Sequence, residues 1–343
     1  MIGVGVVGAG FWGPNIVRAL LSLPMCSVVR VCDTRAGRLQ YIRERFPQVE
    51  VTPDYDDLLC DPRLDAIFVV TGIHTHYDLA LRALDSGRHV FVEKPLAIST
   101  EQAREIVERA AAHDRVLGVG HLFVYHPAIA RLRQEIEAGA LGRLCIMASE
   151  RINLGPPAAE VDVIWDLAVH DVAIALDLIG CTPSEVTAYG GHYVRPSLVD
   201  AALLILRYPD GQLSQHQVSW LSPDKVRRFF VAGTAGSARF DLANEPRALS
   251  LFGAGVDTRI GARDDQVVEL KYGPGEVRVP ELPAVEPLKA ECQHFLECVV
   301  MGGSPRANGL AGLNVVRVLE AAGQSIALGS QPVPLFPLAP ATR

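Results

Sequence analysis

The first 120 residues alternate short apolar runs with amphipathic stretches of helical period. The apolar runs are rich in Val, Ile and Phe and show no polar alternation. Strands of that kind are buried on both faces, which is typical of a parallel sheet covered by helices. The predicted strands cover residues 2–7, 28–32, 66–70, 89–92 and 116–119. The predicted helices lie between them, over residues 13–23, 36–45, 77–86 and 101–113.

The rhythm changes after about residue 122. Predicted helices over 128–138 and 161–179 flank a strand at 144–151, and longer strands follow at 199–208, 212–219 and 227–232. Pro209-Asp210-Gly211 is a hairpin turn, so these strands form an antiparallel sheet. Helices over 288–300 and 308–328 close the pattern. We therefore predict an α/β chain, with a doubly wound parallel Rossmann sheet followed by an α+β domain with a large, open, mostly antiparallel sheet. The expected domains are a Rossmann domain at residues 1–122 and a substrate-binding and oligomerisation domain at 123–331, with a proline-rich tail at 332–343. An alternative placement has helices near the C-terminus packing back on the Rossmann domain.

Bulk properties narrow the function. A chain of 343 residues fits two domains, and a net charge of −7 argues against nucleic acid as a partner. The sequence shows no signal peptide and no apolar stretch long enough to span a bilayer, so we expect a cytoplasmic protein without membrane contacts. The seven cysteines include no CxxC pair, and no His, Cys and Asp cluster has the spacing of metal ligands. We expect reduced thiols and no metal.

A glycine-rich segment connects the first strand to the first helix. It reads Gly8-Ala9-Gly10-Phe11-Trp12-Gly13, a GxGxxG pattern in the position it takes in dinucleotide-binding folds. The glycines allow a tight turn, close approach of a pyrophosphate and close helix packing, and the helix N-terminus favours the anion. Residues Gly8, Gly10, Phe11, Trp12 and Gly13 are therefore predicted to contact the cofactor.

An acidic residue ends the second strand. Asp33 stands 20 residues after Gly13, where a carboxylate accepts hydrogen bonds from the adenosine ribose hydroxyls. Such a carboxylate repels a 2′-phosphate and favours NAD over NADP. Arg35 weakens that preference because an arginine there can hold a 2′-phosphate. The alternative role for Asp33 is that of a helix N-cap.

Two further segments carry candidate chemistry. Glu93-Lys94-Pro95 follows the strand at 89–92, at the sheet edge where open α/β sheets bind ligands, although alone it is only a charged turn. Asp166 and His170 are spaced i, i+4 in an apolar stretch, so they share one face of a predicted helix. A buried histidine is usually a core residue, but a carboxylate one turn away favours proton chemistry.

Together these segments resemble the Gfo/Idh/MocA family of NAD(P)-dependent oxidoreductases over nearly the whole chain. The resemblance consists of the glycine loop, Glu93-Lys94-Pro95, the Asp166-x-x-x-His170 helix and the segment Ala290-Glu291-Cys292-Gln293-His294-Phe295. Members mostly oxidise or reduce a carbinol carbon of sugars, inositols or nucleotide-linked sugars. Residues 119–123 and 165–167 look most like members that act in sugar-nucleotide biosynthesis.

The resemblance implies roles for individual residues. Lys94 would stabilise the developing alkoxide, and His170 would be the general base. Asp166 would orient the substrate or hold the other two residues. Thr71, His76 and Glu93 are implied to line the cofactor cleft. For Thr71 the end of a strand is an equally good interpretation, and for His76 a helix cap is.

Substrate and assembly remain open at the level of sequence. Arg151, Arg195 and Arg227 are candidate anchors for an anionic substrate group, although single arginines on strands are usually solvated. Alternatives to the dehydrogenase are a redox-assisted elimination or glycoside cleavage with retained cofactor, a keto-sugar reductase and a non-catalytic dinucleotide sensor. Apolar residues on both faces of the strand at 199–208 predict a homodimer or homotetramer formed through the second sheet.

Overall fold

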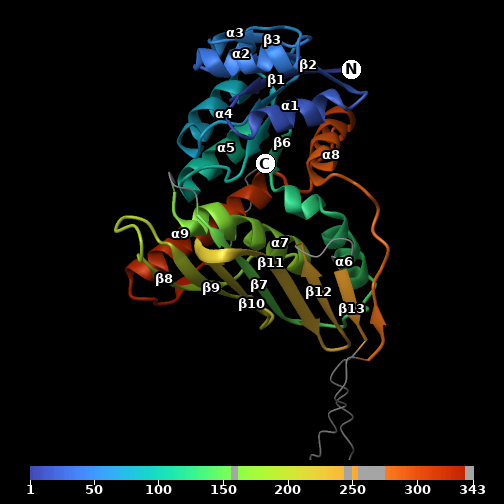
Figure 1. Ribbon diagram of the computed structural model, residues 1–343, viewed down its shortest axis with the longest axis vertical. Helices are drawn as coiled ribbons and strands as arrows, with labels where there is room; N and C mark the ends of the chain where they lie inside the picture. The colour runs from blue at the N-terminus through green and yellow to red at the C-terminus, as the bar shows by residue number, and fades with distance from the viewer. Residues whose placement is uncertain (156–160, 243–248, 254–274, 337–343) are drawn as a thin grey trace, which may run out of the picture. The chain divides into compact units, whose positions relative to one another are not determined.

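The computed structural model describes residues 1–155, 161–242, 249–253 and 275–336. The chain forms two compact units (Figure 1). The first contains Met1–His126 and Val285–Arg317, and the second contains Pro127–Ala284 and Val318–Arg343. Residues from the C-terminal third of the chain therefore belong to the same unit as the N-terminus.

A six-stranded, entirely parallel sheet forms the centre of the first unit, as predicted. Its order is β3-β2-β1-β4-β5-β6, so the order reverses between β1 and β4. The strands are β1 (Ile2–Val7), β2 (Cys26–Cys32), β3 (Glu50–Thr52), β4 (Ala66–Val69), β5 (His89–Glu93) and β6 (Leu117–Gly120). The helices between them are α1 (Gly13–Leu21), α2 (Ala36–Arg45), α3 (Asp56–Leu59), α4 (His76–Asp85) and α5 (Thr100–Ala112). Such a reversal is where open α/β sheets bind ligands.

Helix α8 (Pro287–Met301) supplies a large part of the first unit's core. Its apolar side chains, among them Cys292 and Phe295, pack with Ile16 of α1 and Phe91 of β5. The Phe295 ring meets Phe91 edge-on, with 5.5 Å between centroids. Gly118 makes room for it, because a Cβ atom there would lie 2.8 Å from the Phe295 ring. Burial of this helix anchors Glu291, which the same helix carries, inside the unit.

A nine-stranded sheet forms the second unit, in the order β14-β13-β12-β11-β7-β10-β9-β8-β15. Only β10 and β7 pair in parallel; the other neighbours are antiparallel, which confirms the prediction of a mostly antiparallel sheet. The strands are β7 (Leu144–Leu154), β8 (Glu185–Gly191), β9 (Ala201–Arg207), β10 (Leu213–Ser219), β11 (Leu221–Gly233), β12 (Ser237–Asp241), β13 (Leu249–Phe252), β14 (Val277–Arg278) and β15 (Val333–Pro334).

Helices cover one face of this sheet. Helix α7 (Val169–Ile179) packs on β7 and β10 and against α6 (Pro127–Glu137) (Figure 1). Along β9, Ala202, Leu204 and Leu206 are buried under this layer, whereas the alternate residues Ala201, Leu203 and Ile205 are only half-buried. Within the chain, then, one face of the sheet is covered and the other is left partly open.

Two features depart from the sequence pattern. The predicted tail begins with strand β15, which pairs with β8, and the Leu335 N–H donates to the Ser184 carbonyl over 2.8 Å. The rest of that tail lies outside the described residues. Helix α9 (Gly309–Ala327) begins in the first unit and ends in the second.

Among the described residues, no helix is long and apolar enough to cross a membrane.

Candidate active site

Each glycine of the loop between β1 and α1 meets a different steric demand. Gly8 has a φ of +105°, and a Cβ atom there would lie 2.3 Å from the Val70 carbonyl oxygen. At Gly13 a Cβ atom would lie 2.3 Å from the Gly8 carbonyl oxygen, so helix α1 can begin directly beside the loop only without a side chain. A Cβ atom at Gly10 would meet open space, with Arg35 Nη2 at 3.8 Å the nearest atom in the described part of the chain outside the loop. The loop therefore presents bare backbone to a ligand.

Asp33 connects this loop to the end of β2. The residue is buried, and its Oδ2 atom accepts from the Ala9 N–H over 2.8 Å. Its Oδ1 atom accepts from the Arg35 N–H over 2.9 Å. Burial alone would raise the pKa of Asp33, but the hydrogen bonds from Arg35 and Ala9 outweigh it and lower the pKa. Asp33 is therefore an anion, and it does not cap α2, whose N-cap is Arg35.

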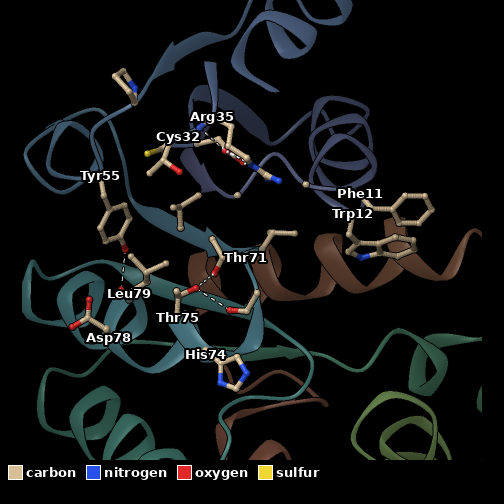
Figure 2. Close-up of a pocket in the computed structure, with 18 residues that line it drawn as sticks. Phe11, Trp12, Cys32, Arg35, Tyr55, Thr71, His74, Thr75, Asp78 and Leu79 are labelled. Atoms are coloured by element: carbon tan, nitrogen blue, oxygen red, sulfur yellow. Dashed lines mark hydrogen bonds and ion pairs between the residues drawn. The ribbon is translucent and has the colours of Figure 1, made fainter. Parts of the chain in front are cut away.

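A cavity of about 730 Å³ opens beside these residues (Figure 2). Of the predicted cofactor residues, Gly8, Gly10, Phe11, Trp12, Asp33 and Thr71 line it. The Phe11 ring is 88% exposed and lies at the outer side of the cavity. A cavity of this size, lined by a buried anion and by the glycine loop next to it, fits a nucleotide.

Three further residues of this cavity wall were not predicted from the sequence. Tyr55, Thr75 and Asp78 line the cavity as well, from the region of α3 and from helix α4. The Thr75 hydroxyl donates to the Thr71 hydroxyl over 2.7 Å, and the Tyr55 hydroxyl donates to the Leu79 carbonyl over 2.9 Å (Figure 2). No sequence motif marks these residues. They lie at the cavity because the parallel strands end at the same edge of the sheet, which brings together segments that are distant in the sequence.

His76 is buried outside the cavity lining. Its Nδ1 atom lies 2.9 Å from the Pro95 carbonyl oxygen and its Nε2 atom 3.1 Å from that of Thr71. Burial lowers the pKa of His76, so the neutral ring donates to one of these two carbonyls. His76 thus joins the turn after β4 to the turn after β5. It neither lines the cavity nor caps α4, whose N-cap is Thr75.

The turn after β5 carries Glu93 and Lys94. Glu93 is buried, Lys94 is half-buried, and the Lys94 N–H donates to the Glu93 Oε2 atom over 3.1 Å. Neither residue lines the cavity described above. The turn lies at the carboxyl end of β5, next in the sheet to β4, whose own end leads into Thr71.

Asp166 and His170 lie in the second unit, at the start of α7. The prediction of one regular helix over 161–179 is wrong at its beginning, because Ile164–Ala168 forms a π-helical turn and α7 starts at Val169. Asp162 initiates that turn, since its Oδ1 atom accepts from the Ile164 and Trp165 N–H groups. Asp166 and His170 are half-buried, whereas the apolar residues between them are buried, so both lie on the more accessible side. Single π turns are frequent at functional sites.

Asp166 is positioned by a residue from another element. The Trp220 indole N–H donates to its Oδ2 atom over 3.3 Å. The guanidinium of Arg195 lies over the Trp220 ring, 5.5 Å from its centroid. Arg195 is fixed in turn by Asp200, whose Oδ2 atom accepts from three successive N–H groups, those of residues 193, 194 and 195. Arg227 interacts electrostatically with Asp166 and Asp171. Arg195 and Arg227, two of the three candidate arginines, therefore lie near Asp166.

The third candidate, Arg151, has a structural role. It donates from Nε and Nη2 to the Asp171 Oδ1 atom over 2.9 and 2.7 Å, and each side chain is 3% exposed. This ion pair lies under α7, directly beside His170. A buried pair of this kind fixes geometry, since neither charge can move without leaving the other uncompensated.

A histidine lies deeper under α7. His216 on β10 lies between two hydroxyls, with Ser149 Oγ 2.8 Å from Nδ1 and Ser214 Oγ 2.9 Å from Nε2. Burial lowers its pKa to about 4, although Asp171 opposes the shift. His216 is therefore neutral at physiological pH. Among the described residues, no cluster of His, Cys, Asp or Glu is arranged to hold a metal ion.

Comparison with known proteins agrees with this geometry. Residues 2–121 match the model of an oxidoreductase family with an NAD-binding Rossmann fold, and residues 129–239 match the Gfo/Idh/MocA C-terminal domain. The scyllo-inositol 2-dehydrogenase (NAD(+)) of Bacillus subtilis is 27% identical over 318 residues, which cover 89% of this chain and 86% of the relative. The UDP-N-acetylglucosamine 3-dehydrogenase of Acidithiobacillus ferrooxidans is 29% identical over 322 residues, covering 93% and 95%.

Solved structures agree as well. The structure of that UDP-N-acetylglucosamine 3-dehydrogenase is similar with a TM-score of 0.83 at 27% identity, covering 96% of this chain and all of the other. GenD2 from gentamicin A biosynthesis, in complex with NAD, gives a TM-score of 0.81 at 26% identity, covering 98% and 97%. With a Rossmann unit, a mostly antiparallel nine-stranded sheet and matches to both domain models, this chain belongs to the Gfo/Idh/MocA family of NAD(P)-binding oxidoreductases.

Proposed function

We propose that the chain is an NAD-dependent dehydrogenase that moves hydride between the nicotinamide and a carbinol carbon of a sugar, an inositol or a nucleotide-linked sugar. The observation that carries the cofactor assignment is the ionised carboxylate of Asp33 beside the open backbone at Gly10, both on one cavity. The substrate class rests on relatives whose names are those of inositol and nucleotide-sugar dehydrogenases.

The preference for NAD over NADP follows from charge. Asp33 can accept hydrogen bonds from the ribose hydroxyls and repels a 2′-phosphate. Arg35, the cation that could offset this repulsion, donates two side-chain hydrogen bonds to Asp33. A 2′-phosphate would have to compete with that ion pair. We therefore assign Gly8, Gly10, Gly13 and Asp33 to NAD binding, with Phe11, Trp12 and Thr71 at the edge of the site.

Bound NAD would supply the hydride acceptor, and the residues of the chain would handle charge and proton. Lys94 as a cation stabilises the alkoxide that develops at the substrate oxygen. His170 takes the hydroxyl proton, which suits a group with a pKa near working pH. Asp166, held by Trp220, orients the substrate hydroxyl or His170. Glu93 sets the turn that carries Lys94.

A second proposal concerns assembly. The partly open face of the nine-stranded sheet carries neighbouring apolar residues, among them Ile146 paired in register with Leu213, and Phe230 paired with Ala148. An apolar sheet face of this kind is normally covered by another subunit. We propose a homodimer or homotetramer formed through this face. A monomer at micromolar concentration in light scattering would contradict it.

The function is tested with the purified chain, NAD, and a panel of free sugars, inositols and UDP- or dTDP-linked sugars, with NADH followed by its near-ultraviolet absorbance. We expect NADH with one substrate class and none for Lys94→Ala, which still binds NAD in calorimetry. NADH formation that persists in Lys94→Ala would refute the assigned role. Tight NAD binding without NADH across the panel would instead favour a retained-cofactor mechanism, a keto-sugar reductase or a dinucleotide sensor.

A further inference from the structure

Two buried carboxyl groups in the first unit interact with each other electrostatically. Glu93 ends β5 and is 8% exposed, and Glu291 lies on α8 and is 1% exposed. Within the described part of the chain, both oxygens of Glu291 and the Oε1 atom of Glu93 have no hydrogen-bond partner. The Glu93 Oε2 atom accepts from the Lys94 N–H. An unsatisfied buried carboxyl group is costly, and a native protein that keeps two of them needs a reason for it.

The side chains around Glu93 and Glu291 do little to stabilise a negative charge on either carboxyl group. Lys94 is the cation that faces Glu93. The Trp12 indole faces Glu93 too, but its N–H does not reach hydrogen-bond geometry. His121, the residue after β6, is 2% exposed, and burial together with Lys94 lowers its pKa to about 3, so it adds no charge.

Glu291 is carried by a helix whose buried residues belong to the apolar core. Cys292 is buried beside it, and Cys26 faces Cys292 from β2. Gly120 of β6 is paired in register with Glu93, and a Cβ atom at Gly120 would lie 2.9 Å from the Glu93 carboxyl group. Strand β6 is therefore packed tightly against this carboxyl group. Within the described part of the chain, Lys94 is the cation that acts on Glu93, and one positive charge is too little to stabilise two buried negative charges.

A carboxyl group in such a place keeps its proton. Burial raises the pKa of Glu93 to about 7, against the effect of Lys94. Burial and the neighbouring Glu93 raise the pKa of Glu291 well above its usual value. Two interacting acids in one low-dielectric site titrate as a pair, and the second proton leaves only at a much higher pH than the first. Glu291, which is more deeply buried and farther from a cation, is the member that holds its proton.

We propose that Glu291 is a protonated positioning residue: it keeps a neutral carboxylic acid behind Glu93, so that one negative charge remains on Glu93 and fixes the turn that presents Lys94. The proton stays within the pair and no bond to the substrate is formed. The effect on turnover rests on the proposed function, whereas the protonation state does not.

The protonation state is tested by infrared spectroscopy of the full chain at mildly alkaline pH, above the pKa of about 7 of Glu93, where Glu93 is ionised and Glu291 keeps its proton. We expect the carbonyl stretch of a protonated carboxylic acid in the wild type and its loss in Glu291→Gln. A control is Asp177→Asn, because Asp177 is a half-buried acid, paired with Arg133, whose pKa burial raises to about 6. Absence of the band in the wild type, or a band that Glu291→Gln leaves unchanged, would overturn the proposal.

Turnover tests the positioning role. Glu291→Ala should lower kcat roughly 10- to 100-fold with the KM for NAD unchanged, since displaced reacting groups cost that much. Glu291→Gln, which has the shape of the neutral acid, should restore kcat and remove the alkaline step in the pH profile that loss of the second proton causes. Equal kcat in the Ala and Gln variants would contradict the role even where the infrared band is present. If the wild type shows no turnover, the proposed function fails, and the infrared result still decides whether Glu291 holds a proton.

Discussion

Arg35 donates its Nε and Nη2 hydrogens to the two carboxylate oxygens of Asp33, over 3.0 and 2.9 Å. The Arg35 side chain is 61% exposed while that of Asp33 is 5% exposed, so the mobile partner of this pair is the arginine. Asp33 and Arg35 both line the cavity, with Arg35 as the exposed partner of the pair. Cofactor preference therefore depends on which of the two residues remains available to the ribose.

Asp33→Ser should raise the KM for NAD by roughly 10- to 100-fold, because hydrogen bonds to a charged group contribute about 1.5–3 kcal/mol. The same change releases Arg35 for a 2′-phosphate, so the ratio of kcat/KM values should move toward NADP. Steady-state kinetics with both cofactors measures this, with Arg43→Ala on the exposed side of α2 as control. An unchanged cofactor ratio in Asp33→Ser would show that Asp33 does not bind the ribose.

Trp220→Phe removes the N–H that holds Asp166 while retaining an aromatic ring. We expect kcat to fall roughly 10- to 100-fold, since the lost hydrogen bond reaches a carboxylate, and the KM for NAD to stay constant. Tyr193→Phe, an exposed hydroxyl loss in the neighbouring loop, is the control. A change in the KM for NAD alone would mean that Trp220 does not act through Asp166.

Asp171→Asn removes the carboxylate that accepts two hydrogen bonds from the buried Arg151 guanidinium. The free energy of unfolding of the second unit should fall by about 3–5 kcal/mol, as measured by denaturant titration. The exposed pair Arg109–Asp85 gives the matched comparison, because Asp85→Asn should cost about 1 kcal/mol or less. Equal losses in the two variants would contradict the structural role of the buried pair.

His216 gives the second unit a defined sensitivity to acid. Its neutral ring is favoured in the folded state, so its contribution to stability is complete above the unfolded pKa of about 6.5 and is lost as the pH falls toward about 4. Lowering the pH from 7 to 5 should therefore cost the wild type about 2 kcal/mol more than His216→Gln, which keeps hydrogen-bonding atoms but cannot take a proton. Identical pH dependence of the two unfolding free energies would show that His216 is not buried as a neutral ring.

The Rossmann unit could be predicted from the sequence because its signals are local. Gly8, Gly13 and Asp33 lie within one βαβ unit, and their spacing alone fixes their places around the loop. The short strand β3 was missed because Glu50–Thr52 has three residues and no apolar run. The tail was predicted without structure because prolines dominate it, yet Val333–Pro334 pairs at the edge of the sheet, where a proline needs no ladder partner.

The inner parts of the site depend on contacts between distant residues. Arg151 and Asp171 each belong to a predicted element, but their pairing depends on how α7 lies across β7. The π turn at Ile164–Ala168 has the same apolar pattern as a regular helix. Glu291 was quoted as part of a family segment, but its burial was not predicted, because a glutamate on an amphipathic helix is ordinarily solvent-exposed. Its position is visible only once α8 packs into the first unit.

Hydride transfer from a carbinol carbon to NAD can be followed with an isotopically labelled substrate. The substrate identified in the panel is prepared with deuterium on the carbon that carries the reacting hydroxyl, and the NADH formed is analysed by mass spectrometry. We expect the NADH to carry the deuterium, and we expect His170→Asn to slow its formation without changing the label. Product formation with the deuterium in solvent or product, and none in NADH, would contradict a released-cofactor dehydrogenase.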